Sequence, residues 1–340
     1  MTTSMALVGD IYMKRDDPAS LFSLTGTHLT GSDIVFGNLE APLIEKGTPV
    51  IGKTAFKSEP RMVEALTAGR FKAVGVANNH SMDQGAEGIL NTLKVLDRAK
   101  IAHTGAGRNV VEAHKPAIVE AKGTKVAFLS YASVFLPTYA AEADRPGIAK
   151  VTVATAYQAP ARVFEQPASP PIIITTPDAA DMEALRHDIK KAKRRADIVV
   201  ISWHWGVSQG FRALVPYQVD LGHAAIDAGA DLIIGHHPHV LQGIEVYKGK
   251  VICYSMGNFV FTYKSPYFDI EAIILKCQID GKHIKRVSFV PALANDDLQP
   301  VVLGPKEGQA VVDKIKQLST EFGTTFKPEG NEIVIGPKAS

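Results

Sequence analysis

The stretch that decides the fold is Asp231-Leu-Ile-Ile-Gly-His-His-Pro-His-Val240, a short apolar run that ends in a histidine-rich loop. Residues 231–234 are typical of a buried strand. In the loop, His237 and His239 stand on either side of a proline, and residues two apart in extended backbone point to the same side. Such a Gly/Pro loop is not a core pattern, so the stretch predicts metal or substrate chemistry at a strand end.

The same arrangement of apolar run and polar end recurs along the chain. Further strands are expected at 5–8, 33–36, 71–76, 125–129, 197–201 and 250–254, with helical patterns at 60–67, 85–99, 180–195 and 216–228. This alternation predicts an α/β sheet layered with helices. In α/β folds, ligands bind beyond the carboxyl ends of the strands. Polar residues that directly follow the apolar runs are therefore expected to form one site: Asp10, Asn38, Asn79, His204 and His237.

Two segments fall outside the alternation. Residues 135–177 are rich in Pro, Ala and Thr and predict a long irregular insertion, which can serve as a lid over the site. The tail beyond about residue 295 carries a helical pattern at 311–322 and a strand-like run at 332–335. A length of 340 residues allows two domains. One large domain over 1–295, with an extension at 296–340 packed on it, fits the pattern better.

The composition excludes several classes of protein. Because 37 Lys+Arg stand against 35 Asp+Glu, the chain has no electrostatic footprint for nucleic acid or an anionic membrane. Two cysteines exclude a disulfide scaffold and a thiolate zinc site. No apolar run reaches the roughly 18 residues of a spanning helix, and the first residues lack the basic and apolar regions of a signal peptide. We therefore expect a cytoplasmic protein without nucleic-acid or membrane partners.

Carboxylate, amide and imidazole groups complete the candidate site. Asp10 and Glu40 supply carboxylates, and a carboxylate can bridge two cations. Asn79 offers an amide oxygen, and His80 can act as a general acid if its neighbours hold the metal. Asp83 is expected either to orient His80 or to cap the following helix. A mixed oxygen and nitrogen set suits Mn, Zn or Fe better than Ca.

In their order along the chain, these motifs resemble the CapA family of capsule synthesis and poly-γ-glutamate biosynthesis, within the calcineurin-like metallophosphatase superfamily. The matching stretches lie within about residues 5–262: Gly9-Asp10 with Arg15, Gly37–Glu40, Ala77–His80 with Asp83, His204–Gly206, Gly229–Asp231, Gly235–Val240 with Gln242, and Tyr254–Phe259. The resemblance implies a two-sheet α/β sandwich flanked by helices, with two metal ions in its usual site.

Carried over by position, the resemblance also implies ligands. The first metal would have Asp10, Glu40 and His239, and the second would have Glu40, Asn79, His204 and His237. His80 matches the general acid, with Asp83 beside it as a second candidate catalytic residue. Tyr12 stands where the superfamily has a histidine ligand, and Ser208 where the family often has a glutamate. The divalent metal, one or two ions of Mn, Zn or Fe, can therefore also be absent.

The hypothesis that follows is a metal-dependent hydrolase, in which metal-activated water attacks an amide bond (γ-glutamyl or peptide-like) or a phosphoester. Its expected partner is a small anionic or peptide-like substrate held by Arg15, Asn38, Lys57 and Asn258. Two alternatives stay open. One is a non-hydrolytic factor in poly-γ-glutamate or capsule assembly. The other is a metal-poor acid–base enzyme, such as an isomerase or epimerase, that uses His80, Asp83 and Glu40.

Overall fold

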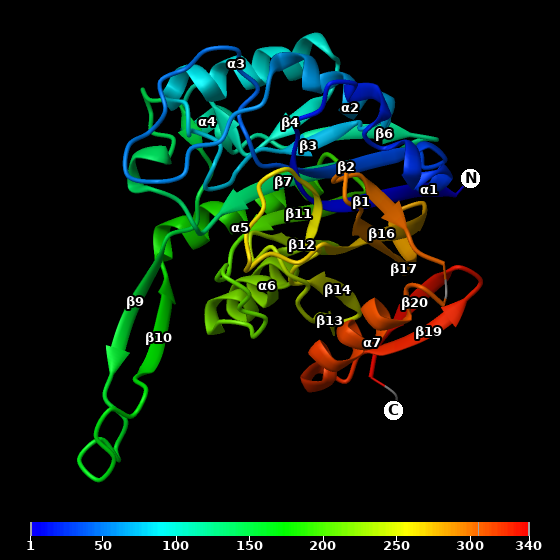
Figure 1. Ribbon diagram of the computed structural model, residues 1–340. Coiled ribbons are helices and arrows are strands. Elements are labelled where there is room, and N and C mark those ends of the chain that lie inside the picture. Colours follow the sequence, from blue (N-terminus) through cyan, green and yellow to red (C-terminus); the bar gives the residue numbers. More distant parts are fainter. Residues whose placement is uncertain (1, 305, 339–340) are drawn as a thin grey trace.

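Two β-sheets packed face to face form the body of the protein, in a computed structural model that describes residues 2–304 and 306–338 (Figure 1). The first sheet contains β1 (Thr3–Tyr12), β2 (Ile34–Leu39), β3 (Ala73–Gly75), β4 (Ala102–Thr104), β15 (Asn258–Phe261), β16 (Glu271–Asp280), β17 (His283–Ala294), β18 (Pro300–Val302), β19 (Thr325–Glu329) and β20 (Glu332–Gly336). The second contains β6 (Ala117–Ala121), β7 (Thr124–Ala132), β11 (Ile198–His204), β12 (Leu232–His236), β13 (Ile244–Tyr247) and β14 (Lys250–Cys253).

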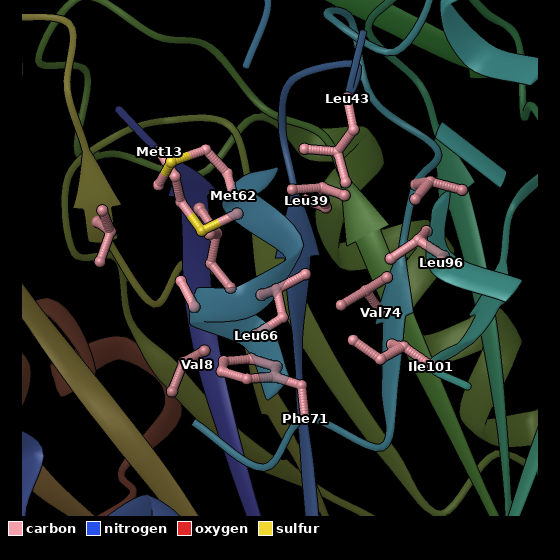
Figure 2. Close-up of a cluster of buried hydrophobic side chains, with 14 of the residues drawn as sticks. Val8, Met13, Leu39, Leu43, Met62, Leu66, Phe71, Val74, Leu96 and Ile101 are labelled. Carbon is pink, nitrogen blue, oxygen red and sulfur yellow. The ribbon is translucent and has the colours of Figure 1, made fainter. Parts of the chain in front are cut away.

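Helices cover the outer face of each sheet. They are α1 (Thr27–Thr30), α2 (Val63–Ala68), α3 (Gly85–Arg98), α4 (Val110–Ala113), α5 (Ala179–Lys193) and α6 (Pro216–Ala228), whereas α7 (Gln309–Leu318) packs into the core between the sheets. Figure 2 shows Leu66 of α2 and Leu96 of α3 packed with Val74 of β3 on the first sheet. On the second sheet, α5 and α6 bury Leu185 and Leu221. Within the described residues, no helix is both long enough and apolar enough to cross a membrane.

The strands that lead to the polar residues pair mostly in parallel, although β1 also pairs antiparallel with β16. β1 pairs in parallel with β2 and β15, and β11 pairs in parallel with β7 and β12. Strands buried on both faces need continuous apolar runs, which is what the sequence carries at 5–8, 197–201 and 231–234. The carboxyl ends of these strands meet at one edge of the two-sheet body, where the polar residues follow.

The α/β class predicted from the sequence is confirmed, and each expected strand and helix lies within an observed element or overlaps it. The description of 135–177 as irregular is wrong for part of its length. β9 (Val153–Gln158) and β10 (Ile172–Pro177) pair as an antiparallel ribbon, and Figure 1 shows this ribbon projecting from the body. The prolines at 160, 167, 170 and 171 lie between the two strands, where a missing N–H breaks no ladder bond. A shorter strand pair, β5 (Ala106–Gly107) with β8 (Gly147–Ile148), lies outside the main sheets.

The tail beyond residue 295 extends the first sheet. β19 and β20 form a hairpin whose second strand pairs with β17. The apolar side of α7 enters the core between the sheets through Val311, Val312 and Ile315. This tail therefore shares the core of the rest of the chain.

The contact between the two sheets gives a stability prediction. Phe36 of β2 stacks on Phe128 of β7 with ring centroids 4.3 Å apart, and both side chains are fully buried. Phe128→Ala is expected to lower the free energy of unfolding by about 3–5 kcal/mol in urea titrations, because it leaves a cavity between the sheets. Ile51→Ala, at a residue that is 96% exposed, is the matched control and should change it by less than about 0.5 kcal/mol. Equal effects of the two changes would contradict this packing.

Candidate metal centre

Asp10 is fixed in the middle of the first sheet. It lies opposite Asn38 of β2 and Asn258 of β15 in the strand register. The close approach of β1 and β15 requires glycine at position 9, because a Cβ there would lie 2.0 Å from the carbonyl oxygen of Gly257. The Asp10 carboxylate is fully buried and accepts hydrogen bonds from Asn38 Nδ2 at 2.8 Å and the His237 N–H at 3.1 Å.

The surroundings of Asp10 favour its charged form. Burial alone would raise the pKa of this carboxyl, but His236, His239 and the His237 N–H together lower it to about 2. His236 Nδ1 lies 3.3 Å from Asp10 Oδ1. Asp10 therefore carries a negative charge throughout the neutral range.

Glu40 follows β2 directly, and its carboxylate is the most unusual group in the site. The side chain is completely buried, and neither Oε1 nor Oε2 accepts a hydrogen bond from any residue that the structure describes. Burial, followed by the negative charge of Asp10, raises its pKa well above the usual range. A buried carboxylate without a donor is costly, and a cation beside it would remove that cost.

Two groups of possible ligands share this carboxylate. Glu40, His204 and His237 form one group, and Asp10, Glu40 and His239 form the other. Within each group the ligand atoms lie within 4.8 Å of one another, and all five residues are buried. Asn79 belongs beside the first group, since its Oδ1 lies 2.8 Å from His204 Nε2. The structure thus brings together every residue that the sequence offers as a metal ligand.

The three imidazoles of these groups stay uncharged. Burial lowers the pKa of His204 well below its usual value, that of His237 to about 3 and that of His239 to about 4. Neutral imidazole is the form that binds a metal. His239 donates from Nδ1 to Asn258 Oδ1 at 2.8 Å, which leaves the lone pair on Nε2, 3.6 Å from Glu40 Oε1.

The loop that carries His237 and His239 has an unusual backbone. Both residues have positive φ angles, 95° and 57°. Non-glycine residues rarely adopt this conformation, which costs free energy and is frequent at functional sites. The surrounding structure therefore holds both rings in place against local backbone preference.

His80 lies beside the ligand groups, and Asp83 holds its ring. His80 Nδ1 is 2.5 Å from Asp83 Oδ2, and Asp83 Oδ1 also accepts hydrogen bonds from Lys53 Nζ at 2.7 Å and the Tyr139 hydroxyl at 2.9 Å. Burial lowers the pKa of His80, while Asp83 acts in the opposite direction. Of the two roles left open for Asp83, the structure favours orientation of His80, because α3 begins after Gln84.

An aromatic wall closes one side of the site. Tyr12 stacks on Phe56 with centroids 4.4 Å apart, and Phe56 stacks on His80 at 3.8 Å. The ring of Tyr12, at the position where the sequence resemblance led us to expect a histidine ligand, belongs to this wall. One of the two ligand groups is therefore limited to Asp10, Glu40 and His239.

The residues expected to contact substrate lie in two different places. The amides of Asn38 and Asn258 are engaged with Asp10 and His239. Arg15 and Lys57 are not among the ligand groups: together with Lys14 and Arg61, they line a separate cavity of about 520 Å³. In that cavity Arg15 Nε donates to Ser20 Oγ at 2.9 Å, and Lys57 Nζ donates to the carbonyl of Glu45 at 3.0 Å.

Sequence reasoning missed Lys53, Phe56 and Tyr139. Lys53 and Phe56 come from an irregular loop, and Tyr139 comes from the insertion. Besides Asp83, Lys53 also bonds the carbonyl oxygen of Asn79. No periodic pattern marks these positions, so the sequence carries no signal that would single them out.

Comparisons with known proteins agree with the order of the motifs. The family described as bacterial capsule synthesis protein PGA_cap matches residues 4–263. The capsule biosynthesis protein CapA of Bacillus anthracis is 32% identical over 76% of this chain and 59% of its own length. The PGA biosynthesis protein CapA of Bacillus subtilis is 34% identical over 76% of this chain and 63% of its own. The chain thus spans about three fifths of the length of these relatives.

Two further similarities extend this comparison. A probable polyglutamine synthesis accessory protein of Mycobacterium tuberculosis is 32% identical over 69% of this chain and 57% of its own length. The solved structure of GAP50, the anchor in the inner membrane complex of Plasmodium, aligns with 94% of this chain and 96% of its own at a TM-score of 0.41 and 9% identity.

Glu40→Gln tests whether the shared carboxylate binds a cation. In chelator, the variant is expected to unfold at the same temperature as the original protein or higher, because glutamine has no charge to bury. Added Mn²⁺ or Zn²⁺ should stabilise the original protein by about 2.7 kcal/mol at a hundredfold excess over Kd and so raise its unfolding temperature. The unfolding temperature of the variant should not change. Differential scanning calorimetry measures both. Glu64→Gln, at an exposed position, is the control, and a metal response that survives in Glu40→Gln would contradict this assignment.

The lowered pKa of His237 gives a prediction of pH dependence. The unfolded chain binds a proton at this residue below about pH 6.5, whereas the folded protein does so only near pH 3. Stability in chelator should therefore fall as the pH drops from 6.5, and His237→Gln should reduce this slope by about 1.4 kcal/mol per pH unit. Urea titrations at several pH values measure the slope. His283→Gln, at an exposed residue, is the control, and an unchanged slope in His237→Gln would show that the ring is accessible to protons.

Proposed function

The chain belongs to the family of bacterial capsule synthesis proteins, and from that premise we propose that it is a metal-dependent hydrolase of γ-glutamyl amide bonds with a calcineurin-like metallophosphatase fold. The observation that supports the proposal is the fully buried Glu40 carboxylate, which belongs to two ligand groups. One group adds His204 and His237, and the other adds Asp10 and His239. Carboxylate and imidazole donors in this arrangement suit Mn, Zn or Fe. A carboxylate shared between two groups is also typical of two-metal hydrolases.

The candidate ligands divide into two sets. Asp10, Glu40 and His239 would hold one ion; Glu40, Asn79, His204 and His237 would hold the other. A divalent ion bound there lowers the pKa of a water molecule toward neutrality and polarises the bond that is attacked. Asn38 and Asn258 keep Asp10 and His239 in the required orientation.

His80 is placed to move a proton. Its Nδ1 is engaged with Asp83, so the ring is fixed and Nε2 is left for a leaving group. Lys53 and Tyr139 hold Asp83 from the other side. The stacked ring of Phe56 keeps water from one face of the imidazole. In amide hydrolysis, the doubly protonated ring of His80 would give its Nε2 proton to the departing nitrogen and keep its Nδ1 proton on Asp83.

The substrate class rests on the relatives and on charge. The names of the Bacillus relatives refer to capsule and PGA biosynthesis. A γ-glutamyl chain carries one free carboxylate per residue, and in the lining of the separate cavity Lys14, Arg15, Lys57 and Arg61 outnumber Asp16 and Glu59. An excess of cations attracts a polyanionic chain to this cavity. We therefore place the γ-glutamyl amide before a phosphoester.

A second candidate function is a non-hydrolytic role in assembling the polymer. The name of the mycobacterial relative, a synthesis accessory protein, favours this alternative. In that case the ligand groups would bind metal and polymer without bond cleavage. Activity measurements separate the two candidates.

The test uses protein stripped by chelator and then reconstituted with Mn²⁺, Zn²⁺ or Fe²⁺. Cleavage of poly-γ-glutamate and of a γ-glutamyl anilide is expected with metal and not without it, with slower turnover of an aryl phosphodiester. Bound metal without cleavage of any of these substrates would favour the accessory role. Less than about half an equivalent of metal per chain, with activity unaffected by chelator, would exclude a metal-dependent reaction.

His80→Gln tests the proton-transfer role. Turnover is expected to fall by roughly 10²–10⁴ while metal content stays unchanged, because the general acid is lost and the ligands remain. Single-turnover kinetics and elemental analysis measure the two quantities. His103→Gln, in a histidine that lies away from the ligand groups on β4, is the control. Loss of metal from His80→Gln would mean that His80 is itself a ligand.

A further inference from the structure

The ribbon of β9 and β10 is the feature that the metal centre does not explain. Its six paired positions run from Val153 opposite Pro177 to Gln158 opposite Ile172. At its base, the Asp178 N–H donates to the Thr152 carbonyl at 2.8 Å, and Asp181 accepts from the Thr152 N–H at 2.9 Å. Figure 1 shows the remainder standing away from both sheets. An isolated two-stranded ribbon is marginally stable in water.

Apolar side chains cover both faces of this ribbon. Tyr157 and Ile173 lie opposite each other and share one face, and they are 72% and 49% exposed. Ile172 and Ile174 share the other face and are 48% and 43% exposed. At the tip, Phe164 is 95% exposed. Exposed apolar side chains that gather on one projecting segment are typical of an interaction surface.

The ribbon also lacks the charges that usually protect free strand edges. Between residues 153 and 177 the sequence contains only two charged residues, Arg162 and Glu165, and both lie in the tip. Natural edge strands are normally shielded by lysine or by inward-pointing charges. Two copies of this ribbon therefore meet no electrostatic repulsion, and the absence of a cationic cluster gives it no attraction for anionic lipid.

From these observations we propose that the ribbon is a dimerisation arm whose partner is the arm of a second copy of this chain. The free edge of β9 pairs with the same edge of its partner about a two-fold axis, because the base of β10 packs against α6. The result is a four-stranded sheet. At about 200 Å² for a fully exposed large side chain, the five apolar residues present roughly 600 Å² per arm over its two faces and its tip, against the ~800 Å² per partner of a stable interface, and pairing of the edges buries the part of this surface that lies beside β9.

The first test is the mass of the full chain in solution, measured by sedimentation equilibrium and light scattering. The protein is expected to have twice the mass of one chain, and Ile173→Glu is expected to have the mass of one chain. Ile51→Glu is the matched control, because Ile51 is 96% exposed but lies on a different loop, and it should remain dimeric. Circular dichroism checks that each variant is folded. A monomeric original protein, or a dimer that Ile173→Glu does not disrupt, would overturn the proposal.

The second test locates the contact and does not depend on a disruptive variant. Both native cysteines are buried, at 0% and 2% exposure, and burial raises the pKa of each to about 12, so they do not react readily. Ala156→Cys places a thiol at the middle of β9. A short bis-maleimide should then link two chains, whereas Glu64→Cys, on α2, should give no linked product. Linkage from both positions or from neither would overturn the proposal.

A third test asks whether the arm binds a membrane and not a second copy of the chain. The protein is mixed with phosphatidylglycerol–phosphatidylethanolamine vesicles and centrifuged. No cosedimentation is expected. Cosedimentation of a monomeric protein that Phe164→Glu abolishes would assign the arm to a lipid surface and would overturn the dimer.

Discussion

The burial of the Glu40 carboxylate is the constraint on which the site depends. Moving a charged carboxylate out of water costs several kcal/mol unless a cation or hydrogen-bond donors compensate. None of the described residues donates to either oxygen, and the nearby charge of Asp10 makes ionisation harder still. The neighbouring groups are three neutral imidazoles, which offer lone pairs and no charge. A divalent cation fits this combination of ligands, and the proposed hydrolytic chemistry follows from it.

The two-sheet body makes this arrangement possible. Parallel strands from both sheets end at one edge, so the last residues of β1 and β11 and the residues that follow β2 and β12 bring their side chains together. The approach of β1 to β15 requires Gly9, and the backbone at His237 and His239 adopts positive φ angles. Local backbone preference is overridden at these positions. The packed sheets supply the free energy that holds the ligands in place.

The ligands could be predicted from the sequence because each follows an apolar strand. Asp10, Glu40 and His237 come directly after runs whose burial in the sheets is complete. Lys53 and Tyr139 could not be predicted, because they reach the site from irregular segments positioned only by tertiary contacts. The separation of Arg15 from the ligands could not be predicted either, because no periodic sequence pattern indicates the direction in which a loop runs. The ribbon at 153–177 was missed because its strands are solvent-exposed and carry little of the pattern that burial imposes.

The most direct measurement of the central claim is anomalous X-ray scattering from crystals grown with Mn²⁺ or Zn²⁺. The account predicts a metal peak bonded to Glu40, with His239 and Asp10 or with His204 and His237 as further ligands. Where both groups are filled, two peaks should lie about 3.5–4 Å apart. Saturating metal with no peak at Glu40, and ordered water bonded to its carboxyl group instead, would contradict the account.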